Sequence, residues 1–146
     1  MNKRVYWLIG LLVVALVAVV AYAAGAWRQP GGALEDREWV LISYGPKDAL
    51  KTALSTTEAT ATFDSAEGRV AGKGSVNSYS GSYTVSGSTL TLTSPIVQTL
   101  MAGPQDAMDQ ESAFLRALQA AASYEVDGDV LEIATADGGL LVLEAR

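Results

Sequence analysis

The amino-acid sequence predicts a mostly β domain of the α+β class, a curled, barrel-like antiparallel sheet with one packed helix, behind an N-terminal transmembrane helix. Three observations predict this arrangement. Short runs of alternating apolar and polar residues recur between turn-forming residues. One stretch has the periodicity of an amphipathic helix. The chain also opens with a long uncharged segment that a Pro-Gly-rich spacer follows.

The N-terminal segment Val5–Ala26 contains no charged residue. As a helix it would be about 33 Å long, against about 30 Å for the hydrocarbon core of a bilayer. We therefore expect residues 1–28 to be an uncleaved anchor, with the domain outside the cytoplasmic membrane because the four-residue head is easier to leave inside. The alternative is a secretory signal peptide with a basic start at Lys3 and Arg4, cleaved near Ala21-Tyr22-Ala23.

Residues 29–36 are assigned to a linker, and residues 37–146 to the domain. The first predicted strand, Trp39–Tyr44, is apolar on both faces, which predicts a central, buried strand. In the second predicted strand, Glu58–Phe63, the alternation directs inward the three side chains of Ala59, Ala61 and Phe63. The short segment Asp48–Ala53 between them is compatible with a helical turn or a loop.

The middle of the domain reads as further strands. Arg69–Lys73 follows a turn at Asp64–Gly68. Ser82–Val85 and Thr89–Thr93 are predicted to pair as a hairpin across Ser86-Gly87-Ser88, with Leu90 and Leu92 on one face and the threonines on the other. Another strand is expected over Ile96–Met101.

One helix is predicted at Asp106–Ala122, after Pro104 and with negative charge in its first turn. At 100° per residue one face collects six side chains, those of Ala107, Glu111, Phe114, Leu115, Leu118 and Ala122. Three strands follow, at Ser123–Val126, Asp129–Ala134 and Leu140–Glu144. Asp127-Gly128 indicates a type I′ turn between the first two, and Asp137-Gly138-Gly139 a turn before the third.

Composition excludes several function classes. The chain has no cysteine and no histidine, so disulfides, thiolate or Ser–His catalysis and the commonest metal ligands are absent. All 16 acidic residues lie at Glu35 or beyond, with seven basic residues, giving the domain a net charge of −9. This charge disfavours nucleic acid as a partner. Asp127-Gly128-Asp129 lacks the remaining ligands of a calcium loop and is interpreted as a turn, and no cofactor or metal is expected.

Two motifs resemble the META domain family, also called HslJ-like. The stretch Gly72–Tyr83 resembles the family signature G-x-x-G-C-N-x-Y-x-G-x-Y, in which Asn77, Tyr79, Gly81 and Tyr83 match. The stretch Thr99–Leu118 resembles T-x-M-A-C followed by E-x-x-F/Y-L-x-A-L, in which Thr99, Met101 and Glu111 match. The resemblance covers about residues 37–145.

The resemblance also has departures and implications. Val76 and Gly103 stand where the family commonly has cysteines, and Ser75 replaces a usual glycine. If the family cysteines pair, this chain lacks both partners together. The resemblance implies a bacterial envelope protein connected with stress responses such as heat shock or drug tolerance, and it implies no reaction. Together with the N-terminal segment, it leads us to expect an inner-membrane protein with its domain on the periplasmic side.

Glu111 is the most informative residue, because it lies near the middle of an apolar helical stripe. A carboxylate there must be hydrogen-bonded, paired or protonated. Our hypothesis is that it accepts hydrogen bonds from the Gly74–Gly81 loop, with Arg69 or Lys73 as other donors, and so attaches this loop to the sheet. The alternative is a general acid or base. In that loop Asn77 tolerates and Gly81 can supply left-handed backbone, and Tyr83 is expected to pack inward. We interpret the segment as a structured loop; the alternative is a rim for a ligand or partner, with Tyr79 exposed.

These observations favour a non-enzymatic, membrane-tethered envelope domain with a structural or protein-interaction role, for which an envelope protein is the candidate partner. The alternative is a binding module for a small apolar ligand or a peptide on the curled sheet. A carboxylate-based hydrolase would need two carboxylates at one cleft, and only Glu111 stands out.

Overall fold

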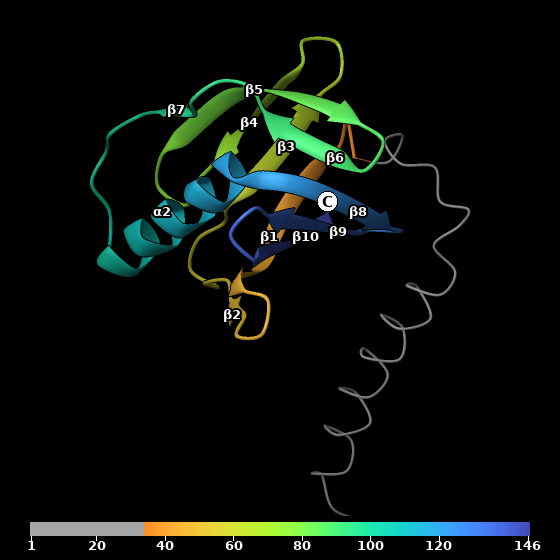
Figure 1. Ribbon diagram of the computed structural model, residues 1–146. Coiled ribbons are helices and arrows are strands. Elements are labelled where there is room, and N and C mark those ends of the chain that lie inside the picture. The colour runs from red at the N-terminus through yellow and green to blue at the C-terminus, as the bar shows by residue number, and fades with distance from the viewer. Residues whose placement is uncertain (1–33) are drawn as a thin grey trace, which may run out of the picture.

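The computed structural model describes residues 34–146, which form a closed antiparallel barrel with one helix across one end (Figure 1). Its staves are eight strands: β1 (Glu38–Pro46), β3 (Thr60–Asp64), β4 (Arg69–Lys73), β5 (Ser78–Ser86), β6 (Thr89–Leu92), β8 (Ala121–Asp127), β9 (Val130–Thr135) and β10 (Gly139–Ala145). Two-residue strands β2 (Lys51–Thr52) and β7 (Val97–Gln98) add to β1 and β5. The helix is α2 (Gln105–Gln119).

The barrel closes through the first and last strands. β1 pairs with β10 in antiparallel register, Trp39 opposite Ala145 and Leu41 opposite Leu143, with a bulge between Leu41 and Ser43. Neighbouring strands then follow in the order β1-β3-β4-β5-β6-β8-β9-β10. The predicted curled sheet is therefore confirmed, in the stronger form of a closed barrel, which removes the exposed edges of an open sheet.

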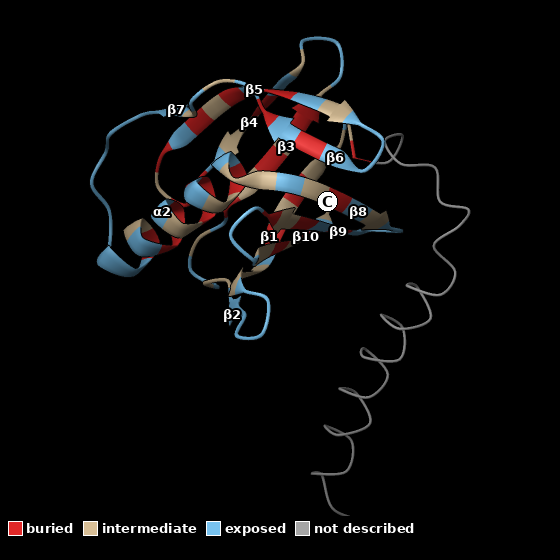
Figure 2. Ribbon diagram, viewed as in Figure 1, coloured by how far each residue is buried: buried red, intermediate tan, exposed pale blue. Residues whose placement is uncertain are grey.

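Alternating side chains fill the barrel. Ala59, Ala61 and Phe63 are fully buried, as the alternation predicted. Leu90 and Leu92 face inward from β6, whereas the threonines on its other face are exposed. Figure 2 shows the resulting pattern of buried residues along the staves and along one side of α2.

Two of the predicted turns differ in detail. Asp127 pairs with Val130, so the turn residues are Gly128 and Asp129 rather than Asp127 and Gly128. Of this pair, only Gly128 has a positive φ, of 61°. A type I′ turn needs positive φ at both central residues, so that prediction is wrong. The hairpin between β5 and β6 has the same form, with Gly87 at φ 59°.

Four further expectations are corrected. β1 is buried on one face only, and Ile42 at its bulge is exposed, because a barrel stave has a solvent side. β7 contains two residues, not the six of Ile96–Met101. α2 ends at Gln119, and Ala122 lies in β8, outside the helical face.

The fourth correction concerns the start of the domain. Leu34 was assigned to the linker, but its side chain is fully buried in the core and its carbonyl accepts a hydrogen bond from Trp39 Nε1 at 2.8 Å. The domain therefore includes Leu34. The undecided segment after β1 forms a turn and then β2. The predicted membrane helix lies outside the described residues, and no helix within 34–146 is long and apolar enough to cross a membrane.

Candidate functional site

Glu111 is buried on the inner face of α2, with 3% of its surface exposed. Its Oε2 accepts hydrogen bonds from the backbone N–H groups of Val76 at 2.8 Å and Asn77 at 2.7 Å, and its Oε1 accepts one from Asn77 Nδ2 at 2.7 Å. The helix thus holds the loop between β4 and β5 through one carboxylate. The predicted contact with this loop is confirmed.

All three donors to Glu111 are N–H groups of the predicted loop, and neither of the two cationic candidates, Arg69 and Lys73, is among them. Within residues 34–146 the carboxylate makes no ion pair with Arg69 or Lys73; Arg69 instead donates to the Ser80 hydroxyl at 2.7 Å. Three N–H donors are a strong set for a buried carboxylate, because hydrogen bonds to a charged acceptor are shorter and stronger than neutral ones.

Asn77 extends this network to the loop between β7 and α2. Its Oδ1 accepts from the Met101 N–H at 2.6 Å and from the Thr99 hydroxyl at 2.9 Å, and its Nδ2 also donates to the Met101 carbonyl at 3.1 Å. Both donors and both lone pairs of the amide are therefore used. Asn77 does not adopt the left-handed backbone that asparagine tolerates; its role is to connect Glu111 with Thr99 and Met101.

The residue beside Glu111 has a second anchoring role that the sequence analysis missed. Gln110 is fully buried; its Oε1 accepts from the Leu54 N–H at 2.8 Å and its Nε2 donates to the Ser75 hydroxyl at 2.9 Å. Ser75 has φ +145°, a conformation that is nearly restricted to glycine. The unusual backbone of Ser75 has one sign in the sequence, because Ser75 stands where the family usually has glycine. The burial of Gln110 follows from its place next to the apolar stripe of the helix.

Glycines allow these elements to approach closely. A Cβ on Gly74 would lie 2.7 Å from Glu111 Cγ, and a Cβ on Gly72 would lie 2.2 Å from the Thr60 carbonyl oxygen. Both positions therefore need glycine because of contact distance. Gly81 has no positive φ, so it does not supply left-handed backbone; a Cβ there would meet Ile96 Cγ1 at 3.4 Å.

The two positions of the family cysteines lie in contact. A Cβ on Gly103 would lie 3.5 Å from Val76 Cβ and 2.7 Å from Val76 Cγ2. The first distance is within the range of paired cysteines. In this chain the branched valine occupies the space that the second side chain would need, so the two replacements complement each other.

Tyr79 and Tyr83, the two tyrosines of the first motif, are both buried. Tyr83 packs inward as predicted, and its hydroxyl donates to Glu35 Oε1 at 2.5 Å. Tyr79 is also buried, with 4% exposed; its ring meets Phe114 edge-to-face and its hydroxyl donates to the Thr60 carbonyl at 2.7 Å. The alternative of an exposed rim at Tyr79 is therefore wrong, and both tyrosines belong to a structured segment. The two tyrosines have the same strand parity, a signal that both side chains point inward.

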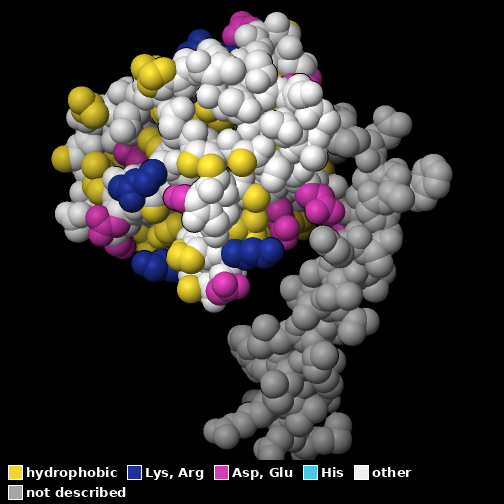
Figure 3. Space-filling view, in the orientation of Figure 1, with side chains coloured by type: hydrophobic (Ala, Val, Ile, Leu, Met, Phe, Trp, Pro, Cys, Tyr) yellow, Lys and Arg dark blue, Asp and Glu magenta, His cyan; other side chains and the backbone are white. Residues whose placement is uncertain are grey.

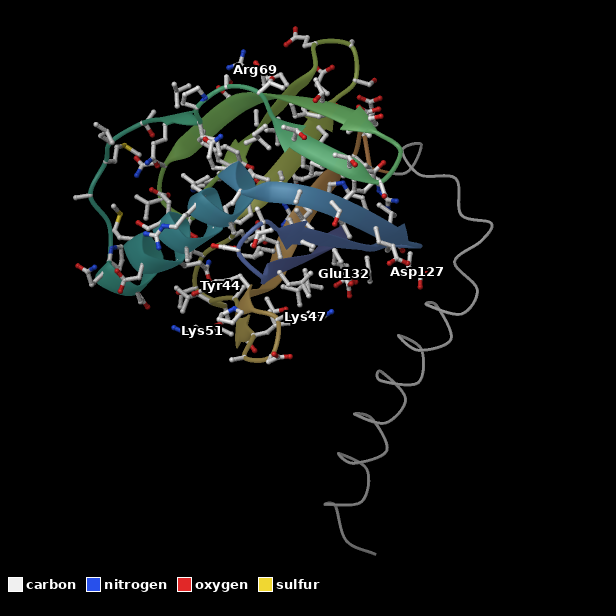
Figure 4. The ribbon with its side chains drawn as sticks, viewed as in Figure 1. Tyr44, Lys47, Lys51, Arg69, Asp127 and Glu132 are labelled. Atoms are coloured by element: carbon white, nitrogen blue, oxygen red, sulfur yellow. The ribbon has the colours of Figure 1, made fainter. Side chains whose placement is uncertain are left out.

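Charged side chains are exposed on several strands and turns of the barrel. Figure 4 labels Lys47 and Lys51 beside β2, and Asp127 and Glu132 on β8 and β9. Glu132 faces Glu125 across the strand pair. Partial burial, and then repulsion from Glu125, raise the pKa of the Glu132 carboxyl. Within residues 34–146 no group of three acidic, His or Cys side chains is placed to hold a metal ion.

The comparisons with known proteins agree with this architecture. A protein from Burkholderia xenovorans, solved by NMR, is similar in structure with a TM-score of 0.67 and 21% identity, covering 83% of this chain and 92% of its own. A DUF4847 family protein from Bacteroides vulgatus has a TM-score of 0.53 and 14% identity, covering 77% and 94%. At these identities the likeness concerns the fold alone. Among curated proteins, no relative matches the chain.

The sequence itself matches the META domain model over residues 32–146. This range includes the loop that Glu111 holds, both tyrosines and the last strand. The chain belongs to the META domain family.

Proposed function

We propose that this protein is a non-enzymatic interaction domain of the bacterial envelope. In this proposal Val5–Ala26 anchors it in the inner membrane, and the barrel stands on the periplasmic side. The observation that carries the proposal is the use of Glu111: among residues 34–146 it is the one charged side chain that is buried, and both its oxygens are taken by amide donors.

A carboxylate in this arrangement is poorly suited to proton transfer. Three N–H donors stabilise its charged form, and a substrate would have to displace at least one of them. Glycosidase-type chemistry needs a second carboxylate within about 5–9.5 Å, facing the same cleft. Glu111 shares its surroundings with Gln110, Asn77 and apolar side chains instead. These contacts favour an anchoring role for Glu111 over a catalytic one.

The barrel interior also bears on the ligand-binding alternative. Trp39, Phe63 and Phe114 are fully buried within one continuous core cluster. A small barrel filled by large side chains has little room for an internal ligand. Interaction through the outer surface is therefore the better-supported mode. The stress-related part of the proposal rests on the family resemblance.

Crosslinking in intact cells tests the proposal. The full chain with a C-terminal tag would be crosslinked in native membranes, purified and compared with Glu111→Gln. We expect the same discrete crosslinked partner from the wild type and from the variant, at a temperature where the variant remains folded. The reason is that the Glu111 carboxylate stabilises the fold and does not contact the partner. The absence of any crosslinked partner with either protein would contradict the proposal. So would turnover of a substrate that Glu111→Gln abolishes without a change in folding.

A topology measurement tests the membrane part separately. A reporter fused after Arg146 that works only outside the cytoplasm is expected to be active, and to stay with the membrane fraction. Activity of a cytoplasm-specific reporter would refute the orientation. A shortened soluble product would instead support cleavage near Ala21-Tyr22-Ala23.

A further inference from the structure

β7 and the loop that follows it place in solvent three apolar side chains, those of Val97, Leu100 and Met101, which we call the apolar tip. Val97 is 65% exposed, Leu100 90% and Met101 60%, the highest exposures of large apolar residues among residues 34–146. Figure 2 shows this loop as an exposed segment, and in Figure 3 hydrophobic side chains protrude at the edge of the molecule where it runs. Adjacent exposed apolar side chains of this kind mark interaction sites on soluble domains.

The loop is held in one conformation although it lacks regular structure. Thr99 donates its N–H to the Ser78 carbonyl at 3.0 Å and its hydroxyl to Asn77, and Met101 is bound to Asn77 through both its N–H and its carbonyl. Leu100 lies between these two attached residues, so its side chain must project outward. Such an ordered apolar tip loses little conformational freedom when a partner binds.

The charges around the tip and on the whole domain indicate what kind of partner the tip could bind. The 32 residues from Gly74 to Gln105 contain no charged side chain, and Arg69 of β4, which is bound to the Ser80 hydroxyl opposite Val97, is a cation beside the tip. The first charges after it are those of Asp106 and Asp109, both exposed in the first two turns of α2. The whole domain carries a net charge of −9. An apolar surface in this field suits a partner that has an apolar groove with Lys or Arg at its rim.

The position of the tip favours a protein over the bilayer. Leu34, where the described chain begins, contacts the barrel end that holds Trp39 and the β3–β4 turn. Thr99 is attached to Ser78, at the start of β5, and β5 pairs with Arg69 only four residues later. Ser78 and the β3–β4 turn are therefore at opposite ends of the β4–β5 pair. The attachment point at Ser78 therefore lies at the other end of this strand pair from the turn beside Leu34.

We infer that Val97, Leu100 and Met101, the apolar tip, are the docking surface for a basic protein partner that receives Leu100 in an apolar groove. The inference rests on the proposed function, since it names the surface through which the interaction occurs. Asn77 then acts as a positioning residue, because its amide binds Thr99 and Met101 on either side of Leu100.

A peptide probe tests the surface directly. The purified full chain would be titrated with an extended peptide of alternating Leu and Lys, and with a matched peptide of Leu and Glu. We expect binding of the Leu–Lys peptide, with methyl chemical-shift changes at Leu100 and Met101. Leu100→Ser/Met101→Ser should weaken it about tenfold or more, as expected from the loss of two apolar anchors. The Leu–Glu peptide should not bind.

The matched control is Ile42→Ser/Val130→Ser, which removes two other exposed apolar side chains, one on β1 and one on β9. It should leave the affinity unchanged. Equal loss with both double variants, or equal affinity for the two peptides, would overturn the inference.

Site-specific crosslinking separates this inference from the proposed function. A photo-reactive residue would be placed at position 100 or at position 130 of the full chain in native membranes. A partner captured from position 100 and lost on Asp106→Asn/Asp109→Asn supports the tip. Capture from position 130 alone refutes the tip but keeps the interaction function, whereas lipid adducts from position 100 refute a protein partner.

Discussion

A disulfide introduced at Val76 and Gly103 is the most quantitative test of the structure. The double substitution Val76→Cys/Gly103→Cys restores cysteines at the two positions where the family commonly has them. The Cβ–Cβ distance of 3.5 Å is at the short end of the normal disulfide range. Neither residue has a positive φ, so cysteine meets no backbone strain at either position. We therefore expect the bond to form in the folded protein.

The stabilisation follows from the length of the closed loop. Val76 to Gly103 spans 28 residues, and the chain-entropy relation assigns such a loop about 12 cal/mol/K, or about 3.6 kcal/mol at 25 °C. Native-state strain lowers this value, so about 2–3 kcal/mol is expected between the oxidised and reduced forms of the same variant. For a domain of this size the shift in Tm is of the order of 10 °C.

The assay is urea and thermal unfolding of the double variant with and without reductant, together with a thiol count. Gly103→Cys alone should destabilise the fold by about 1–3 kcal/mol, because its Cβ would lie 2.7 Å from Val76 Cγ2. The double serine variant serves as the control without a cross-link. Two reactive thiols after oxidation of the folded protein, or equal stability of the two forms, would refute the geometry.

Three further predictions concern Glu111, the glycines and Glu132. Glu111→Gln should lower the free energy of unfolding by about 1–3 kcal/mol in urea titration, since the amide has one acceptor oxygen for three donors, whereas exposed Asp109→Asn should change it by about 0.5 kcal/mol or less. Gly72→Ala should destabilise far more than Gly81→Ala, because the added Cβ lies 2.2 Å from the Thr60 carbonyl in the first case and 3.4 Å from a side chain in the second. The raised pKa of Glu132 means that its ionisation opposes folding, so this penalty is absent below the unfolded pKa and appears as pH rises through the folded pKa. Glu132→Gln should therefore stabilise the protein slightly at pH 7, by about 0.5 kcal/mol, and have no effect near pH 3.

Each of these has a clear contrary outcome. Wild-type stability of Glu111→Gln would show that the three amide contacts are not needed. Equal stability of the two alanine variants would contradict the close approach of β3 and β4 at Gly72. A benefit from Glu132→Gln that grows toward low pH would reverse the assigned sign.

Much of the barrel could be predicted from local patterns. Period-two alternation identified the inward residues of β3 and β6, and a 100° wheel identified the buried face of α2, Glu111 included. These inferences succeed because alternation and helical periodicity decide which side of an element is apolar. The same reasoning overextended the strand at Ile96–Met101, whose local propensity is β. There Asn77 takes the hydrogen bonds that a strand partner would supply.

The sequence by itself determined the composition of the staves, the hairpins between neighbouring strands and the need of Glu111 for donors. Only the tertiary structure decided which donors those are, that β1 closes on β10, and that Tyr79 lies beneath Phe114 instead of on the surface. It also decided that Leu100 is left in solvent. The physical reason is that apolar patterning specifies a face, whereas register and closure depend on contacts between residues far apart in the chain, such as Trp39 and Ala145.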